Sequence, residues 1–436
     1  MKIKTFVTSF IAGAGILAMV GTASANCWNT GTNAPTVPTG DLNVYGASAQ
    51  FAFWSSEAHN YLAAAGCTWK NGGSWADSEA WDNKSNPSHY VVQADCSGVG
   101  GPATVNFRVS SKASYDGPSA VDNQQTPYTD NSCGLGAALN QRPMLNVGPG
   151  TRCAFTAGGN LTCGAPSATT GDCTTVNWGA SDVAVGDFQQ VSGPVSGRNF
   201  ILNPLAITSP DVHDFCNPVA INFGFFVNKA TVTKQSDGTP LDNISTMEAR
   251  LIFSGALTDW SQLASTPTNT QAIVACARNA GSGTHATLDF MIERPGQLFR
   301  VGVGNKKFNE STGNEITCIQ SNNGAIGYTD SDRLISFPNA ALSGPLSIDG
   351  VAPSKAAVIN MTYLFTDGSQ HAYVKDANAA TNFFKDVCLW AGAPAAVSRV
   401  NALFAPTCQM PFVAINSLAN WSVNTMGTGG CTCTGI

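Results

Sequence analysis

The sequence predicts an α/β fold of two lobes that carries a disulfide-rich insertion. Segments typical of strands and of helices alternate along most of the chain, a pattern that favours parallel-rich sheets covered by helices. Two long apolar stretches, near 218–227 and 357–365, are predicted to be strands that cross between the lobes. The amino-terminal and carboxy-terminal segments would then build one lobe, and the middle segment would build the other.

The individual elements follow from apolar periodicity. A short strand over 42–45 precedes a helix whose apolar residues recur at helical spacing from Phe51 to Ala65, and Gly66 is typical of a helix stop. Further strands are predicted at 91–94, 104–109, 219–227 and 271–275, and helices at 247–253 and 380–388. Residues 68–90, rich in Trp, Asn, Gly and Ser, are interpreted as a surface insertion.

The predicted domain organisation begins with a segment that is not part of the fold. Residues 1–25 combine a basic start, an apolar run and a small-residue cleavage site, which is typical of a signal peptide. Lobe 1 is assigned to 26–216 plus 359–436, and lobe 2 to 217–358. The Gly-, Asn- and Thr-rich segment at about 122–175 is interpreted as a disulfide-pinned insertion into lobe 1. We therefore expect a periplasmic or secreted protein with a cleaved signal peptide.

The fourteen cysteines all lie after the signal segment, and in an exported chain this even number predicts up to seven disulfides. No Cys-x-x-Cys pair occurs, and the five histidines are scattered, so neither a metal site nor a cofactor is expected. The formal charge is −6, and it becomes −8 without Lys2 and Lys4. Such an acidic chain is not typical of a protein that binds nucleic acid or an anionic membrane.

The stretch ARNAGSGTHATLDFMI, at 277–292, carries the most informative motif. Its glycines allow a tight turn and a close approach of the backbone to a ligand. The hydroxyls of Ser282 and Thr284 and the free N–H groups of the helix that follows would face the same way, and Arg278 could add a planar fork to an oxyanion. The alternative is that Ser282 or Thr284 only caps a helix and Arg278 lies on the surface.

Four other stretches stand in register with this motif: YGASAQF at 45–51, NWGASDV at 177–183, LIFSGALTDW at 251–260 and NGAIGYT at 323–329. Together the five stretches resemble the periplasmic phosphate-binding proteins of ABC phosphate-uptake systems. These are type II binding proteins with PBP-like domains, in which two α/β lobes close over one ligand. The resemblance spans roughly 41–430, with the cysteine-rich segment as an insertion. It implies a two-lobed periplasmic-binding-protein-like fold (type II).

The resemblance also implies a set of ligand-binding residues. By position these are Gln50, Phe51, Ser114, Asp182, Arg278, Ser282, Gly283 and Thr284. Two positions depart from the family. The family's threonine hydroxyl at the first helix start falls on the Gln50 amide, and the aspartate that commonly orients the arginine falls on Ala280. No catalytic residue and no metal ligand is implied.

Asp182 has a specific chemical role in this interpretation. A carboxylate that faces an anion repels it unless the anion carries a proton to donate. Asp182 would therefore favour hydrogen phosphate over fully ionised sulfate, which would leave the acceptor unpaired beside like charge. The alternative is that Asp182 caps a turn after a strand, which is a common use of aspartate.

The function expected from these observations is that of an exported, non-enzymatic solute-binding protein for phosphate or a related oxyanion. It would be a monomer serving uptake or scavenging, with an ABC permease as a candidate partner. Two alternatives remain. One is a cell-surface or extracellular scaffold with a degenerate binding cleft, and the other is a secreted phosphoesterase. His285 follows the motif directly and could approach the ligand, but we expect it to be an exposed helix residue.

Overall fold

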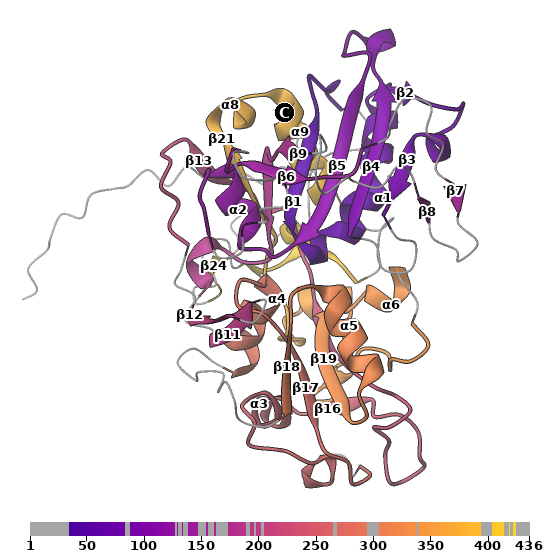
Figure 1. Cartoon of the computed structure of the whole chain (residues 1–436), viewed down its shortest axis with the longest axis vertical. Helices are drawn as coiled ribbons and strands as arrows, with labels where there is room; N and C mark the ends of the chain where they lie inside the picture. Colours follow the sequence, from indigo (N-terminus) through magenta and orange to yellow (C-terminus); the bar gives the residue numbers. More distant parts are fainter. Residues whose placement is uncertain are drawn as a thin grey trace, which may run out of the picture.

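Two β-sheets occupy different halves of the molecule in the computed structural model (Figure 1). The described residues run from 35 to 423, with gaps at 83–87, 127–128, 130–132, 134–137, 147–153, 156–160, 163–172, 189–191, 196–197, 202–204, 265–267, 294–304, 337–338, 394–402, 414–417 and 419–421. The predicted signal peptide therefore lies outside the described residues. No described helix is long and apolar enough to cross a membrane.

The larger sheet has the strand order β13-β21-β10-β1-β5-β4-β2, with β3 beside β4. Its strands are β1 (Leu42–Ala47), β2 (Thr68–Trp69), β3 (Glu79–Trp81), β4 (His89–Asp95), β5 (Val105–Lys112), β10 (Trp178–Ser181), β13 (Val212–Cys216) and β21 (His371–Lys375). Only the central strands, β10, β1 and β5, are mutually parallel. Each flanking strand is antiparallel to the strand beside it. For β4 and β5 the short connection 96–104 requires this, because parallel neighbours need a longer crossover.

The smaller sheet has the order β15-β19-β17-β18. Its strands are β15 (Phe223–Val227), β17 (Val274–Arg278), β18 (Asn305–Asn309) and β19 (Ala325–Asp330). The last three are parallel and β15 is antiparallel to β19. Because the motif residues follow the carboxyl ends of β1, β10 and β17, both sheets present them at the edges where ligand sites form in α/β folds.

Helices cover both faces of the larger sheet. The alternation of side chains along β1 places Val44 in the apolar cluster beneath α1 (Phe51–Ala64) and α9 (Asn382–Gly392). Tyr45 points the other way, into a cluster with Ala120 and Val121 of α2 (Asp116–Val121). On the smaller sheet, α5 (Thr312–Ser321) packs against β17, β18 and β19.

The other described helices are α3 (Thr246–Phe253), α4 (Gly283–Thr287), the π-helix at Leu288–Glu293, α6 (Arg333–Ser336), α7 (Lys355–Ile359) and α8 (Asp376–Ala379). The 3-10 turns are η1 (Ser48–Gln50), η2 (Trp75–Asp77), η3 (Ser97–Val99), η5 (Val185–Asp187), η6 (Trp260–Gln262) and η8 (Thr407–Gln409). Small two-stranded sheets pair β6 (Gln141–Pro143) with β9 (Cys173–Thr175), β7 (Ala154–Phe155) with β8 (Leu161–Thr162), β11 (Ser192–Val195) with β12 (Arg198–Ile201), β14 (Val219–Ala220) with β22 (Ala405–Pro406), β16 (Asn243–Ile244) with β20 (Ser347–Ile348) and β23 (Phe412–Val413) with β24 (Ser422–Val423).

Most predicted elements are confirmed, but the strand predicted at 219–227 is divided into β14 and β15, and two further strands differ from the prediction. The helix predicted from Phe51 ends at Ala64, and Gly66 follows it with a positive φ of 83°. The strand expected at 357–365 is wrong: Ser354 caps the short helix α7 there, and Met361 takes a positive φ of 55° that ends it. The strand expected at 271–275 lies further along, at Val274–Arg278.

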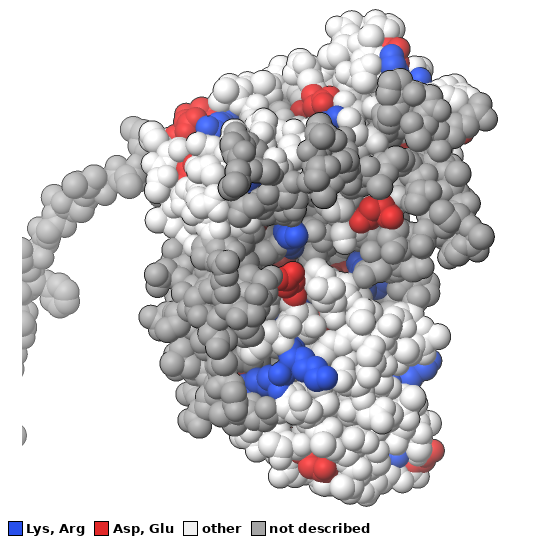
Figure 2. All heavy atoms as spheres, in the orientation of Figure 1, with Lys and Arg blue, Asp and Glu red and all other residues white. Residues whose placement is uncertain are grey.

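Four disulfides join described cysteines: Cys67–Cys96, Cys133–Cys173, Cys216–Cys388 and Cys276–Cys318. Two of them bear on the site. Cys133–Cys173 lies within the cysteine-rich insertion, and Cys276–Cys318 ties β17 to α5. On the face shown in Figure 2, Lys and Arg and Asp and Glu form small scattered groups on a largely uncharged described surface.

A close backbone contact fixes α2 on the sheet. A Cβ atom on Gly117 would lie 2.5 Å from the carbonyl oxygen of Tyr45 and 2.6 Å from that of Ala180. The helix can therefore approach β1 and β10 this closely only with glycine at 117, and this approach places the 113–116 turn before the helix.

We expect Gly117→Ala to lower the free energy of unfolding by about 1–3 kcal/mol, because the added methyl group meets backbone atoms that cannot move aside. Urea unfolding followed by circular dichroism measures the change. Gly186→Ala is the matched control, since a Cβ at that position meets no atom within 4 Å. Equal stability of the two variants would contradict the packing described here.

Candidate functional site

The motif turn begins where β17 ends. Arg278 is the last residue of the strand and is 1% exposed. Gly281 then takes a positive φ of 90°, and the Ser282 hydroxyl accepts a hydrogen bond from the His285 N–H as the N-cap of α4. The helix expected after the turn is present, but α4 is short and continues as the π-helix Leu288–Glu293.

This turn meets the larger sheet at Ser114. The Ser114 hydroxyl donates to Asp182 Oδ2 at 2.9 Å and accepts from the Gly283 N–H at 3.1 Å. The Thr284 hydroxyl lies 3.5 Å from the same Asp182 oxygen. A Cβ on Gly283 would lie 2.6 Å from Asp182 Cβ, so only glycine allows this approach. Four residues proposed from the sequence, Ser114, Asp182, Gly283 and Thr284, are thus in direct contact.

The Asp182 carboxyl is buried among polar groups, at 1% exposure. Burial raises its pKa to about 6, against the opposing effects of the Ser114 hydrogen bond, the nearby Gln370 amide and the Arg278 charge. Among the described residues, no donor forms a hydrogen bond of good geometry with Asp182 Oδ1. One acceptor oxygen of this carboxyl is therefore available to a ligand that brings a proton.

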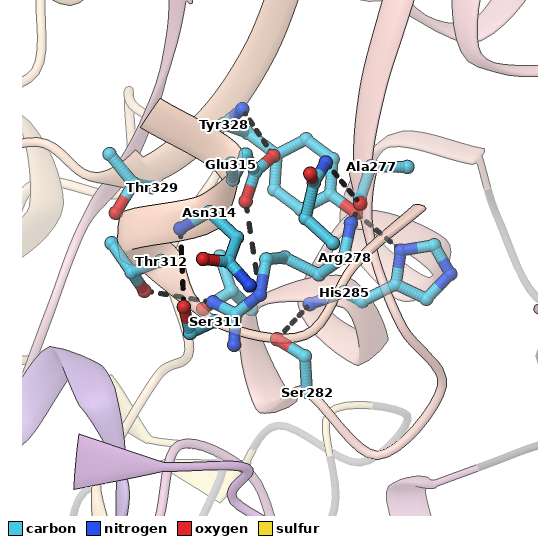
Figure 3. Close-up of polar contacts among 12 residues, drawn as sticks. Ala277, Arg278, Ser282, His285, Ser311, Thr312, Asn314, Glu315, Tyr328 and Thr329 are labelled. Atoms are coloured by element: carbon cyan, nitrogen blue, oxygen red, sulfur yellow. Dashed lines mark hydrogen bonds and ion pairs between the residues drawn. The ribbon is translucent and has the colours of Figure 1, made fainter. Parts of the chain in front are cut away.

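Arg278 lies in the smaller-sheet half, beside Thr312 and Glu315 of α5 (Figure 3). Its Nη1 donates to Thr312 Oγ1 at 2.8 Å, and its Nη2 donates to the Glu310 carbonyl oxygen at 3.3 Å. Thr312 Oγ1 lies 2.8 Å from the hydroxyl oxygen of Ser48, which follows β1 in the larger sheet. This chain of contacts is a second link between the two sheets.

Gln50 and Phe51 lie close to this cluster but have other partners. The Gln50 amide donates to the carbonyl oxygens of Ser181 and His371, and its oxygen accepts from Trp54 Nε1. Phe51 is the first residue of α1 and belongs to the apolar core. The hydroxyl that reaches the arginine cluster from this helix start is that of Ser48, two residues before Gln50.

Three site residues were missed in the sequence. Ser48 and Thr312 carried a usable signal, since each is a hydroxyl residue one to three positions after the end of a parallel strand. Glu315 carried none, because a glutamate in the first turn of a helix is common for reasons of helix stability alone. Glu315 is fully buried on α5 and places its Oε2 3.9 Å from Arg278 Nε, while its Oε1 accepts the Tyr328 N–H at 3.0 Å.

Glu315 therefore provides the carboxyl near the arginine that Ala280 does not. Burial raises the pKa of Glu315 to about 8, although the Arg278 charge and the Tyr328 N–H both lower it. At neutral pH the carboxyl is largely protonated, so it leaves most of the arginine charge uncompensated. A buried guanidinium whose hydrogen-bond acceptors are neutral oxygens favours a nearby anion.

The expectation that His285 is exposed is wrong. Its side chain is 1% exposed, and its Nδ1 forms a hydrogen bond with the Tyr328 hydroxyl. That hydroxyl also accepts the backbone N–H of Arg278 at 2.9 Å. Burial lowers the pKa of His285 to about 3, and the Arg278 charge adds to the effect, so the imidazole is neutral and accepts the tyrosine proton. The pair fixes the backbone at the start of the motif turn.

Among the described residues, no group of three His, Cys, Asp or Glu side chains gathers as metal ligands would. The polar atoms around Arg278 and Asp182 are instead hydroxyls, backbone N–H groups and single carboxyls. Such a set can hold a tetrahedral oxyanion through many uncharged donors and one cation.

The buried carboxyls predict how stability depends on pH. Folding raises the pKa of Glu315 from 4.5 to about 8, that of Glu293 from 4.5 to about 8 and that of Asp289 from 3.8 to about 7, in each case chiefly through burial. The native state then holds more protons than the unfolded state, so these groups lose their stabilising effect as pH rises through their folded pKa values. The lowered pKa of His285 affects the free energy of unfolding only below pH 6.5, where the unfolded state would bind a proton that the native state does not.

We expect the melting temperature to fall by roughly 5 °C between pH 6.5 and pH 8.5. Glu315→Gln, which keeps the acceptor for the Tyr328 N–H, should reduce this fall. Glu310→Gln, at an exposed position, is the control and should follow the unmodified protein. Thermal unfolding at constant ionic strength measures the effect, and a melting temperature that rises over this range would contradict the assignment of neutral buried carboxyls.

Comparison with known proteins gives one family match. Residues 196–383 match the family model described as a PBP superfamily domain. No curated protein matches the chain. The matched segment contains β17 with Arg278, the turn to Thr284, α5 with Thr312 and Glu315, and β21.

Solved structures with a similar fold include a putative phosphate ABC transporter substrate-binding protein with bound phosphate from Clostridium perfringens, at 13% identity and a TM-score of 0.46, covering 84% of this chain and 99% of that one. A high affinity periplasmic phosphate-binding protein bound with phosphate has 14% identity and a TM-score of 0.44, covering 85% and 91%. An ABC-type phosphate transport receptor from Vibrio cholerae has 15% identity and a TM-score of 0.31, covering 45% and 74%. Likenesses this distant do not specify a function. Residues 196–383 of this chain are similar to a PBP superfamily domain, and the structure described above is of mixed α/β architecture.

Proposed function

We propose that this protein binds phosphate or a related protonated oxyanion between its two sheets, as a solute-binding protein and not as an enzyme. The observation that carries the proposal is the contact of the Gly283 turn with Asp182 through Ser114. This contact brings together a backbone N–H, two hydroxyls and a carboxyl acceptor. Arg278 is close enough for its charge to lower the pKa of Asp182.

The balance of charge supports a protonated ligand. Arg278 faces Glu315, and the negative charge of Asp330 acts on both Glu315 and Asp182. A fully ionised divalent anion would meet the Asp182 carboxylate without a proton to share. An anion that carries a proton can donate it to Asp182 Oδ1, the oxygen that lacks a well-formed hydrogen bond within the described residues.

Export and uptake belong to the same proposal. The four disulfides between described cysteines are typical of proteins from oxidising compartments, which supports a periplasmic or secreted location. An ABC permease remains the candidate partner for uptake, and scavenging outside the cell is the alternative use of the same site.

One observation favours a second candidate, an extracellular scaffold whose site no longer binds a ligand. Hydroxyls of the site already have partners: that of Ser114 donates to Asp182, and those of Ser48 and Thr312 form a hydrogen bond with each other. An oxyanion must replace these contacts to bind. Heating the protein with and without phosphate separates the candidates, because a ligand that binds only the native state raises the melting temperature and a pure scaffold does not respond.

We expect isothermal titration of the mature chain to give tighter binding of phosphate and arsenate than of sulfate. Arg278→Ala should lower the affinity for each anion by about tenfold to a hundredfold, because it removes charge-assisted hydrogen bonds. Asp182→Asn should chiefly improve the binding of sulfate, because it removes the repelling carboxylate.

Lys234→Ala is the matched control, since it removes a cation from the smaller-sheet half at a salt bridge with Asp242. It should leave all three affinities unchanged. Equal affinities for the three anions in the unmodified protein would remove the role given to Asp182, and the absence of binding would refute the proposed function.

A further inference from the structure

The turn that carries Ser114 is held from three sides. Ser114 contacts Asp182 and Gly283 through its hydroxyl, and the Tyr115 N–H donates to the Gly281 carbonyl oxygen at 2.9 Å. The side chain of the next residue, Asp116, contacts Arg142 of the cysteine-rich insertion. The 113–116 turn therefore lies between the proposed oxyanion site and the insertion.

The insertion contacts this turn through Arg142. Its Nη2 donates to Asp116 Oδ1 at 2.7 Å and its Nε donates to Asp116 Oδ2 at 3.1 Å, so the guanidinium grips the carboxylate as a fork. The side chains of Arg142 and Asp116 are 1% and 0% exposed. Such a pair fixes both direction and distance, because each oxygen has its own N–H donor.

Arg142 is itself held on its other side. Its Nη1 donates to the carbonyl oxygens of Leu139 and Gln141, and its guanidinium carbon lies 5.7 Å from the centre of the Tyr45 ring. Arg142 belongs to β6, opposite Thr174 of β9. The disulfide Cys133–Cys173 ties the first residue of β9 to Cys133, which precedes β6 in the chain, and after β9 the chain runs directly into β10 and Asp182.

We propose that Arg142 is a positioning residue for the oxyanion site: its fork on Asp116 fixes the 113–116 turn, so that Ser114 stays on Asp182 and Gly283. The proposal rests on the proposed function and gives the insertion a role in it. The part of the insertion that contains β6, β9 and the disulfide Cys133–Cys173 then supports the site through Arg142, without touching the ligand itself. Without the fork, the turn keeps its connection to α2 and the Ser119 hydrogen bond to Asp116, but it loses both guanidinium hydrogen bonds from the insertion.

The test compares Arg142→Met and Arg142→Lys with the unmodified protein in two measurements. The first is the dissociation constant for inorganic phosphate by isothermal titration. We expect this dissociation constant to rise about tenfold in Arg142→Met, which corresponds to the loss of one well-placed hydrogen bond. It should rise by less in Arg142→Lys, because lysine keeps the charge but not the planar fork of donors. The lysine variant also preserves the test if the methionine variant does not fold.

The second measurement needs no ligand. The carboxyl of Asp182 is titrated by NMR in protein with labelled aspartate. The Ser114 hydrogen bond lowers the pKa of Asp182, so a displaced turn should raise that pKa in both Arg142 variants. If the unmodified protein binds no oxyanion, the proposed function fails, while this titration still decides whether Arg142 positions Ser114.

Arg108→Met is the matched control. Arg108 is a second buried arginine of the larger sheet, 2.7 Å from Asp41 at the opposite end of β1 from Ser48. Its loss should reduce stability without changing the titration of Asp182 or the binding of phosphate. If the Arg142 variants behave like Arg108→Met, losing stability but keeping the titration of Asp182 and the affinity for phosphate, Arg142 is only a structural residue and the proposal is overturned.

Discussion

The proposed site depends first on the two hydrogen bonds of the Ser114 hydroxyl, which join the two halves of the molecule. This hydroxyl accepts from a backbone N–H of the smaller-sheet half and donates to a carboxylate of the larger-sheet half. A hydroxyl can accept one hydrogen bond and donate another through the same oxygen. The contact also needs glycine at 283, because a Cβ there would lie 2.7 Å from Ser114 Oγ and 2.6 Å from Asp182 Cβ.

Much of the fold could be predicted from local patterns. The helix from Phe51 to Gly66 and the capped helix before Gly255 depend on periodicity and end signals that lie within a few residues. The stretch at 357–365 failed because an apolar run does not distinguish a buried helix from a strand, and Ser354 as a cap decided the outcome. The antiparallel pairing of β4 with β5 follows from their short connection, whereas that of β21 with β10 joins segments far apart in the chain, which no local pattern marks.

The residues of the candidate site that follow the ends of strands could be predicted from the sequence. Asp182, Arg278 and Gly283 stand in motifs, and the fold brings them together. Glu315 and Arg142 act over contacts between elements far apart in the chain, so no local pattern marks them. His285 shows the opposite case: a polar residue on a short helix was expected in solvent, but the neutral imidazole accepts a hydrogen bond from Tyr328 in the core.

The disulfide Cys276–Cys318 has a consequence for when the site can form. It joins β17, at a position two residues before Arg278, to α5, at a position three residues after Glu315. The bond therefore holds the strand that carries Arg278 against the helix that carries its partners Thr312 and Glu315. A chain kept in a reducing compartment would lack this bond, and we expect the contacts of Arg278 with α5 to be weaker there. If the protein is exported as proposed, its oxyanion site would be completed only where the disulfide can form.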